Sequence, residues 1–93
     1  MREREIFLVM ANTGYEGSDP VRSFAAREDA DAFAAKCNAY DASYKRAPDM
    51  DASDAEWEQW QKEDRSWELE HPAQPFIRRF NYDVMPLRFT SRR

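Results

Sequence analysis

The chain has 93 residues, of which 42% are hydrophobic and 34% are charged, and its formal net charge is −4. This length predicts one domain with one modest core, because a chain so short buries only about 60–65% of its unfolded surface. The six Phe, four Tyr and three Trp exclude a disordered chain, and the negative charge argues against a general nucleic-acid coat.

The first predicted element is a strand at residues 6–10. The run Ile6-Phe-Leu-Val-Met10 is β-branched and aromatic, and the turn-rich segment 12–20 follows it. This pattern is typical of a central, largely buried strand. The alternating segment Val21-Arg-Ser-Phe24 predicts the returning strand of a hairpin with a long loop.

Residues 27–44 predict the first helix. Acidic residues occupy its first turns, where the helix dipole favours carboxylates, but position 26 is an alanine, so packing must hold the helix more than its cap does. The single cysteine lies on the apolar stripe, which predicts a buried small hydrophobe and not a reactive thiol. The stripe, at helical spacing, consists of Ala30, Phe33, Ala34, Cys37 and Tyr44.

A second helix is predicted from about 54 to 70. Ser53 and Glu56 fit a capping box, and the helix should end before His71-Pro72. Its three tryptophans form a narrow stripe along the helix, and Asp64 lies within this stripe. Arg78 and Arg79 are the candidate ion-pair partners of Asp64. Two interpretations stay open: the tryptophans close over the sheet beside Phe33, or some of them stay exposed at an interface.

The last predicted strand begins at Phe80 and alternates to Val84. The apolar phase then shifts to Met85, Leu87 and Phe89 across Pro86, which predicts a bulge or an edge position. The order ββααβ predicts an α+β fold, with a small antiparallel sheet of about three strands and helices packed on one face. Residues 1–93 therefore form a single domain, into which an acidic, Trp-rich helix is inserted at about 54–70.

Charge is unevenly distributed along the chain. The net charge is −1 over residues 1–48, −7 over residues 49–70 and +4 over residues 71–93, where Arg88, Arg92 and Arg93 form a basic tail. The acidic block is either a solvated helix face or a docking surface for a basic partner. In the second case, the predicted partner-binding residues are Glu56, Trp57, Trp60, Glu63, Trp67 and Glu70.

The sequence contains little that could support catalysis. There is no Gly-rich phosphate loop, and the lone His71 and Cys37 are too far apart in sequence to suggest a metal site. A triad of His71 with Ser53 or Ser66 has no supporting signature, and His71 is interpreted as a helix-end residue. We therefore predict no catalytic residue, no metal, no cofactor and no enzymatic activity.

The chain is predicted to be cytoplasmic. Its only early apolar run, residues 6–11, is short for a signal-peptide core, and no stretch approaches the roughly 20 apolar residues of a membrane helix. One cysteine cannot form an internal disulfide, so nothing indicates an oxidising compartment.

Several segments resemble a group of small phage and prophage accessory proteins. They are Ile6-Phe-Leu-Val-Met, Tyr15-Glu-Gly-Ser-Asp, Val21-Arg-Ser-Phe, Glu28-Asp-Ala-Asp-Ala-Phe-Ala-Ala and Tyr82-Asp-Val. The resemblance covers the first 44 residues and about 80–89. It implies a body made of a hairpin, one helix and a last strand. Some small acidic phage proteins inhibit bacterial defence, including anti-CRISPR proteins, so the resemblance also implies a binding protein that acts in the host bacterial cytoplasm.

Two functions are expected from these observations. The first is a non-enzymatic inhibitor that binds a basic surface of a host protein, such as a CRISPR effector, through the acidic helix. The second is a homo-oligomeric structural or accessory phage protein, in which the tryptophans are buried between copies. Direct nucleic-acid binding is not expected, because the net charge is negative and lysines do not cluster.

Overall fold

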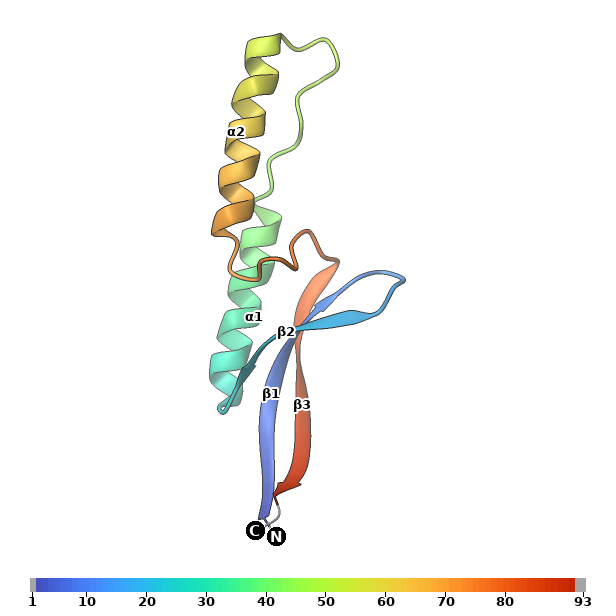
Figure 1. The fold of residues 1–93 in the computed structure, drawn as a ribbon, viewed down its shortest axis with the longest axis vertical. Coiled ribbons are helices and arrows are strands. Elements are labelled where there is room, and N and C mark those ends of the chain that lie inside the picture. The colour runs from blue at the N-terminus through green and yellow to red at the C-terminus, as the bar shows by residue number, and fades with distance from the viewer. Residues whose placement is uncertain (1, 92–93) are drawn as a thin grey trace.

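The strands and helices follow one another in the order ββααβ in the computed structural model, which describes residues 2–91 (Figure 1). Arg92 and Arg93 of the predicted basic tail lie outside the described residues. The three strands form one antiparallel sheet in the order β2-β1-β3, so the predicted α+β class is confirmed. The elements are β1 (Arg2–Asn12), β2 (Ser18–Phe24), α1 (Arg27–Ala42), α2 (Asp54–Glu70) and β3 (Asn81–Ser91).

The central strand β1 is longer than its hydrophobic run predicts. It pairs with β3 along its whole length, from Arg2 to Asn12, but with β2 only from Phe7 onward. Residues 2–6 and 87–91 therefore form a two-stranded ribbon that projects from the body (Figure 1). Pro86 lies on the edge strand β3, as predicted, and the β1–β3 register passes through it unbroken. The bulge is instead in the β1–β2 pairing, between Val9 and Met10.

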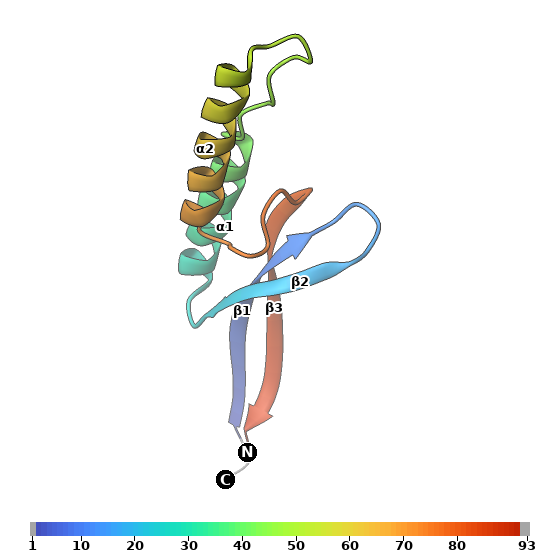
Figure 2. The ribbon, with the colours of Figure 1, turned by 45° about the horizontal axis from the view of Figure 1, so that its top comes forward.

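One face of the sheet packs against α1 (Figure 2). The predicted stripe of α1 supplies Ala30, Ala34 and Cys37, all buried, and Phe33 stacks at the margin of the core on Phe24, with ring centroids 5.5 Å apart. Most of these side chains are small, so the core is small for a chain of this length. Its buried hydrophobic residues are Val9, Ala11, Ala30, Ala34, Cys37, Ala73 and Tyr82.

A side-chain amide of α1 fastens the edge strand β3 to the body. Asn38 Nδ2 donates to the carbonyl of Tyr82 at 2.8 Å, and the Tyr82 N–H donates to Asn38 Oδ1 at 2.9 Å. The Tyr82 hydroxyl donates to the carbonyl of Phe76 at 2.6 Å. Burial raises the pKa of Tyr82 well above its usual value, so this hydroxyl stays protonated and remains a donor.

The second helix lies apart from the sheet. Helix α1 ends at Ala42, earlier than the predicted Tyr44, and an extended segment, residues 43–53, leads to α2 (Figure 1). The predicted cap is confirmed, because Ser53 Oγ accepts the N–H of Glu56 at 3.2 Å, and α2 ends at Glu70 as expected. Within the described chain, α2 has no buried residue and packs on no strand. The interpretation in which the tryptophans close over the sheet beside Phe33 is therefore wrong.

The molecule is elongated as a result, measuring 64 × 24 × 19 Å. Its radius of gyration is 17.6 Å, whereas a compact domain of this length has about 12 Å. Neither helix in the described part is both long and apolar enough to span a membrane.

The buried thiol gives a test of the core. Cys37 is fully buried, and burial raises its pKa from 9.0 to about 11, so the thiolate is about 100-fold rarer at neutral pH than on an exposed cysteine. We expect native protein to react with a thiol reagent at least about 100-fold more slowly than urea-unfolded protein. Rapid labelling of the native chain would contradict this core, and Cys37→Ser, which has no thiol, gives the background.

Candidate functional site

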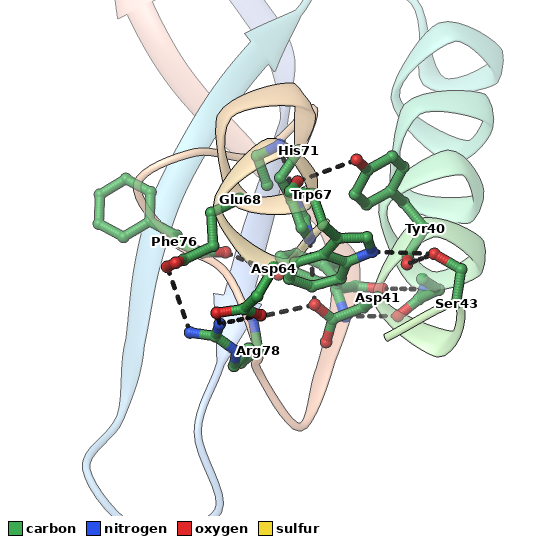
Figure 3. Close-up of polar contacts among 12 residues, drawn as sticks. Tyr40, Asp41, Ser43, Asp64, Trp67, Glu68, His71, Phe76 and Arg78 are labelled. Carbon is green, nitrogen blue, oxygen red and sulfur yellow. Dashed lines mark hydrogen bonds and ion pairs between the residues drawn. The ribbon is translucent and has the colours of Figure 1, made fainter. Parts of the chain in front are cut away.

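The C-terminal half of α2 is joined to the end of α1 by one tryptophan (Figure 3). The Trp67 ring lies 5.2 Å from the ring of Tyr40 and 5.1 Å from that of Tyr44, measured between centroids. Its Nε1 donates to Ser43 Oγ at 3.0 Å, and its carbonyl accepts the Tyr40 hydroxyl at 2.9 Å. Trp67 therefore anchors α2, since its ring and its backbone both contact residues at the end of α1.

An arginine from the segment after α2 closes this junction. Arg78 donates to both carboxylate oxygens of Asp64, at 3.0 and 3.2 Å, and lies 3.4 Å from Glu68. Its guanidinium carbon also lies 4.8 Å from the ring centroid of Tyr44. Of the two predicted partners of Asp64, Arg78 is the one the structure places there, and its Nη2, shared between both carboxylate oxygens, holds the segment 72–80 against α2.

A hydrogen-bonded pair of the buried His71 and the half-buried Asp41 lies beside these contacts (Figure 3). The N–H of Ala73 donates to His71 Nδ1 at 3.0 Å, so Nδ1 carries no proton and Nε2–H donates to Asp41 Oδ1, also at 3.0 Å. The same Asp41 oxygen accepts the N–H of Arg78 at 2.9 Å, which holds Arg78 at a left-handed φ of +53°.

These contacts define what His71 can do. It is the C-cap residue of α2, so the predicted helix-end position is confirmed, and its side chain is buried. Both ring nitrogens are hydrogen-bonded within the chain, so neither is free to take a proton from a substrate. Among residues 2–91, no three His, Cys, Asp or Glu side chains lie close enough together to hold a metal ion.

Two adjacent hollows run along the other side of α2, and together we call them the α2 groove. They measure about 380 and 410 Å³ and share Gln59 and Glu63. The first is lined by Lys45, Arg46, Pro48, Ala55, Glu56, Gln59, Trp60 and Glu63, and the second by Tyr40, Gln59, Lys62, Glu63, Ser66, Trp67 and Glu70.

The wall opposite α2 is the extended segment 43–53 in the first hollow and Tyr40 of α1 in the second. Trp60 Nε1 donates to the carbonyl of Lys45 at 3.0 Å, and Lys45 Nζ lies 3.1 Å from Glu63 Oε2. Hydrogen bonds from Gln59 and then from Lys45 lower the pKa of Glu63, so this carboxylate is ionised but already partly engaged.

The groove brings together five of the six residues predicted to bind a partner. Glu56 and Trp60 line its first hollow, Trp67 and Glu70 line its second, and Glu63 lies between them. Trp57 lines neither hollow and stacks edge-on against Trp60, with centroids 6.0 Å apart. In the described part of the chain, Glu56 and Glu70 have no ion-pair partner, so a carboxylate is available at each end of the groove.

The arginines of the C-terminal segment do not form a comparable free surface. Arg79 lies 3.0 Å from Asp19, Arg88 lies 3.5 Å from Glu5, and Arg78 is held by α2. Residues 71–93 carry the +4 charge, and each arginine that the structure describes in this segment is paired with an acidic side chain.

The sequence interpretation missed Tyr40, Asp41 and Ser43. The signal for Asp41 was present: it lies four residues after Cys37, in the middle of the apolar stripe of α1, where a charged residue needs a partner. Nothing in the local sequence identified Ser43, whose contact with Trp67 depends on how α2 folds back.

Comparisons with protein-family models, with curated proteins and with solved structures found no match to this chain.

Proposed function

We propose that this chain is a non-enzymatic inhibitor of phage or prophage origin that binds a basic surface of a host protein through the α2 groove. The observation that carries the proposal is the placement of the free carboxylates of Glu56 and Glu70 at the two ends of a groove floored by Trp60 and Trp67. Fourteen residues of helix separate the two carboxylates, which is about 21 Å.

The chemistry of α2 favours a cationic partner, because its carboxylates outnumber its cations. Carboxylates attract arginine and lysine, aromatic faces attract the same cations, and the −7 block over residues 49–70 steers a basic surface toward the groove from a distance. Because α2 contributes nothing to the core of the sheet, its outward surface is free to serve binding. This is the arrangement expected of a docking helix more than of a structural one.

A CRISPR effector is the most specific candidate for the partner. Its nucleic-acid channel is basic, and the −7 block over residues 49–70 competes for such a channel by electrostatic complementarity. The site of action is then the host bacterial cytoplasm, and the chain itself need not touch nucleic acid. This identification rests on the resemblance to small phage proteins together with the charge of α2.

The alternative of a homo-oligomer built on the tryptophans has less support. Trp67 already packs inside the chain, and Trp60 already donates its N–H to Lys45. Only Trp57, half-buried near the free end of α2, lacks such an internal hydrogen bond among the described residues.

A plaquing assay tests the proposal in cells whose CRISPR effector targets an infecting phage. Wild-type chain should restore plaque formation, and Glu56→Lys/Glu70→Lys should weaken partner binding about 100-fold or more, because like charges across an interface cost several kcal/mol. The matched control is Glu58→Lys/Glu16→Lys, which makes the same charge change at exposed sites outside the groove. Equal plaque formation with both variants would contradict partner binding through the α2 groove. If wild type does not restore plaque formation, the CRISPR effector used in the assay is excluded as the partner.

A further inference from the structure

The sheet face opposite α1 has an apolar centre that neither helix of the described residues covers. Residues of β1 alternate between faces, so Val9 and Ala11 point to α1, whereas the even-numbered residues point the other way. Ile6 pairs with Leu87 and Leu8 pairs with Met85, so these side chains share the uncovered face. We call this surface the open face, and its apolar members are Ile6, Leu8, Met10, Met85 and Leu87.

The phase shift at Pro86 explains how this face arises. The apolar residues Tyr82 and Val84 of β3 face α1, whereas Met85, immediately before the proline, and Leu87, immediately after it, lie on the opposite face. Met85 and Leu87 are 42% and 43% exposed. A contiguous apolar patch on an otherwise charged chain marks an interaction surface.

The total surface of the chain also exceeds that of a compact folded monomer of its mass. It is 7127 Å², whereas a folded monomer of 11.0 kDa exposes about 5600 Å². The excess is about 1500 Å², and a standard interface removes about 800 Å² from each partner. The elongated shape produces this excess, which leaves room for one interface of ordinary size on the open face.

The charges at the ends of the open face identify the partner. Asp83 pairs with Met10, so it marks one end of the apolar stripe, and Arg4 marks the other end, two residues beyond Ile6. Both are exposed, and neither has an ion-pair partner among the described residues. Two copies can stack face to face so that β1 of one copy runs opposite to β1 of the other. Arg4 of each copy then comes level with Asp83 of the other.

We propose that the open face binds a second copy of this chain, in an antiparallel, two-fold symmetric sandwich of two sheets. The two-fold axis then passes between two apolar rows, Ile6 with Leu87 and Leu8 with Met85. Each row of one copy lies over the other row of the second copy, as a self-complementary interface requires. Helix α1 of each copy lies on the outside, and the two α2 helices point to opposite ends of the dimer. The proposal is independent of the α2 groove, because it uses a different element of the fold.

Light scattering on size-separated full-length protein tests it. Wild type should have twice the mass of the 11.0 kDa chain, and Met85→Lys/Leu87→Lys should dissociate at least about 100-fold more readily. Both positions are already exposed, so the variant should stay folded, with its Cys37 still protected from thiol reagents. A wild-type monomer at about 1 mM chain, or a dimer unaffected by these two lysines, would overturn the proposal.

A charge swap tests the orientation of the two copies. Arg4→Asp and Asp83→Arg should each raise the dimer dissociation constant about tenfold, because each places like charges together twice, and the double variant should return to within about threefold of wild type. A double variant no tighter than either single variant would overturn the antiparallel arrangement. Glu56→Lys/Glu70→Lys, in the α2 groove, should leave the dimer dissociation constant unchanged. A failure of the dimer proposal can therefore be told apart from a failure of the proposed partner binding by the groove.

Discussion

Replacing Trp67 by alanine is expected to destabilise the chain by about 2–4 kcal/mol, below the upper end for a core tryptophan because this residue is only half-buried. The substitution removes the ring that packs against Tyr40, Tyr44 and His71. It also removes the hydrogen bond to Ser43. Urea unfolding followed by far-UV circular dichroism measures the loss.

The shape of the unfolding curve carries a second expectation. An isolated helix of the length of α2, 17 residues, is only marginally stable in water, so α2 should melt when its anchor is lost. About half of the helical signal should then disappear before the rest unfolds, since α1 has 16 residues. Trp67→Phe should cost only about 1–2 kcal/mol, because an aromatic ring remains while one hydrogen bond and part of the packing are lost.

Leu69→Ala is the matched control for this experiment. Leu69 lies on the same turns of α2 but is 68% exposed, so its truncation should change stability by at most about 0.5 kcal/mol. A loss below about 1 kcal/mol for Trp67→Ala, or equal losses for both variants, would show that α2 is held by something other than Trp67.

Asp41→Ala is expected to cost about 2–3 kcal/mol, because it leaves two donors without their acceptor. His71 Nε2–H, which is buried, loses its only partner, and the N–H of Arg78 loses the bond that holds its left-handed backbone. Asp41→Asn keeps an amide oxygen that can accept both bonds, so its cost should be about 1 kcal/mol. Thermal or urea unfolding separates the two substitutions.

Asp31→Ala supplies the control on the same helix. Asp31 is exposed and lies 3.8 Å from Arg27 in a surface pair, which predicts a change of no more than about 0.5 kcal/mol. Equal stability of Asp41→Ala and Asp31→Ala would contradict the role given to the hydrogen-bonded pair of Asp41 and His71.

The body of the fold could be predicted from the sequence because its signals are local. Helical periodicity identified α1, a continuous apolar run identified β1, the Ser53 cap fixed the start of α2, and the phase shift at Pro86 indicated an edge strand. Each of these depends on spacing within one element. The length of β1 was underestimated, because its first residues alternate charge in Arg2-Glu-Arg-Glu5 and are stabilised by pairing with β3.

The position of α2 could not be predicted in the same way. A stripe of three tryptophans has the same spacing on a helix that covers a sheet and on one that folds back against a neighbouring segment. Which of the two positions α2 takes depends on the length of segment 43–53 and on the contacts that Trp67 makes with Tyr40 and Ser43. Trp67 is far in sequence from both of these residues. The row Glu56, Glu63, Glu70 was visible in the sequence, but the pairing of Glu63 with Lys45 was not.

The contacts of α2 reduce the number of carboxylates that are available to a partner below what the charge pattern alone suggests. Asp64 and Glu68 serve the internal contact with Arg78, and Glu63 is shared with Lys45, so the carboxylates left for a partner are chiefly those of Glu56 and Glu70. A variant that reverses all three groove glutamates would also break an internal contact, and for this reason the two-residue variant is the cleaner probe.

Affinity capture of host protein by three chains, side by side, tests the central claim most directly. Wild type and Glu58→Lys/Glu16→Lys should retain the same basic protein at about 0.1 M salt and release it at about 1 M, where the Debye length falls from about 10 Å to about 3 Å. Glu56→Lys/Glu70→Lys should not retain it at either salt concentration. Retention of that protein by the groove variant at the wild-type level would contradict the account.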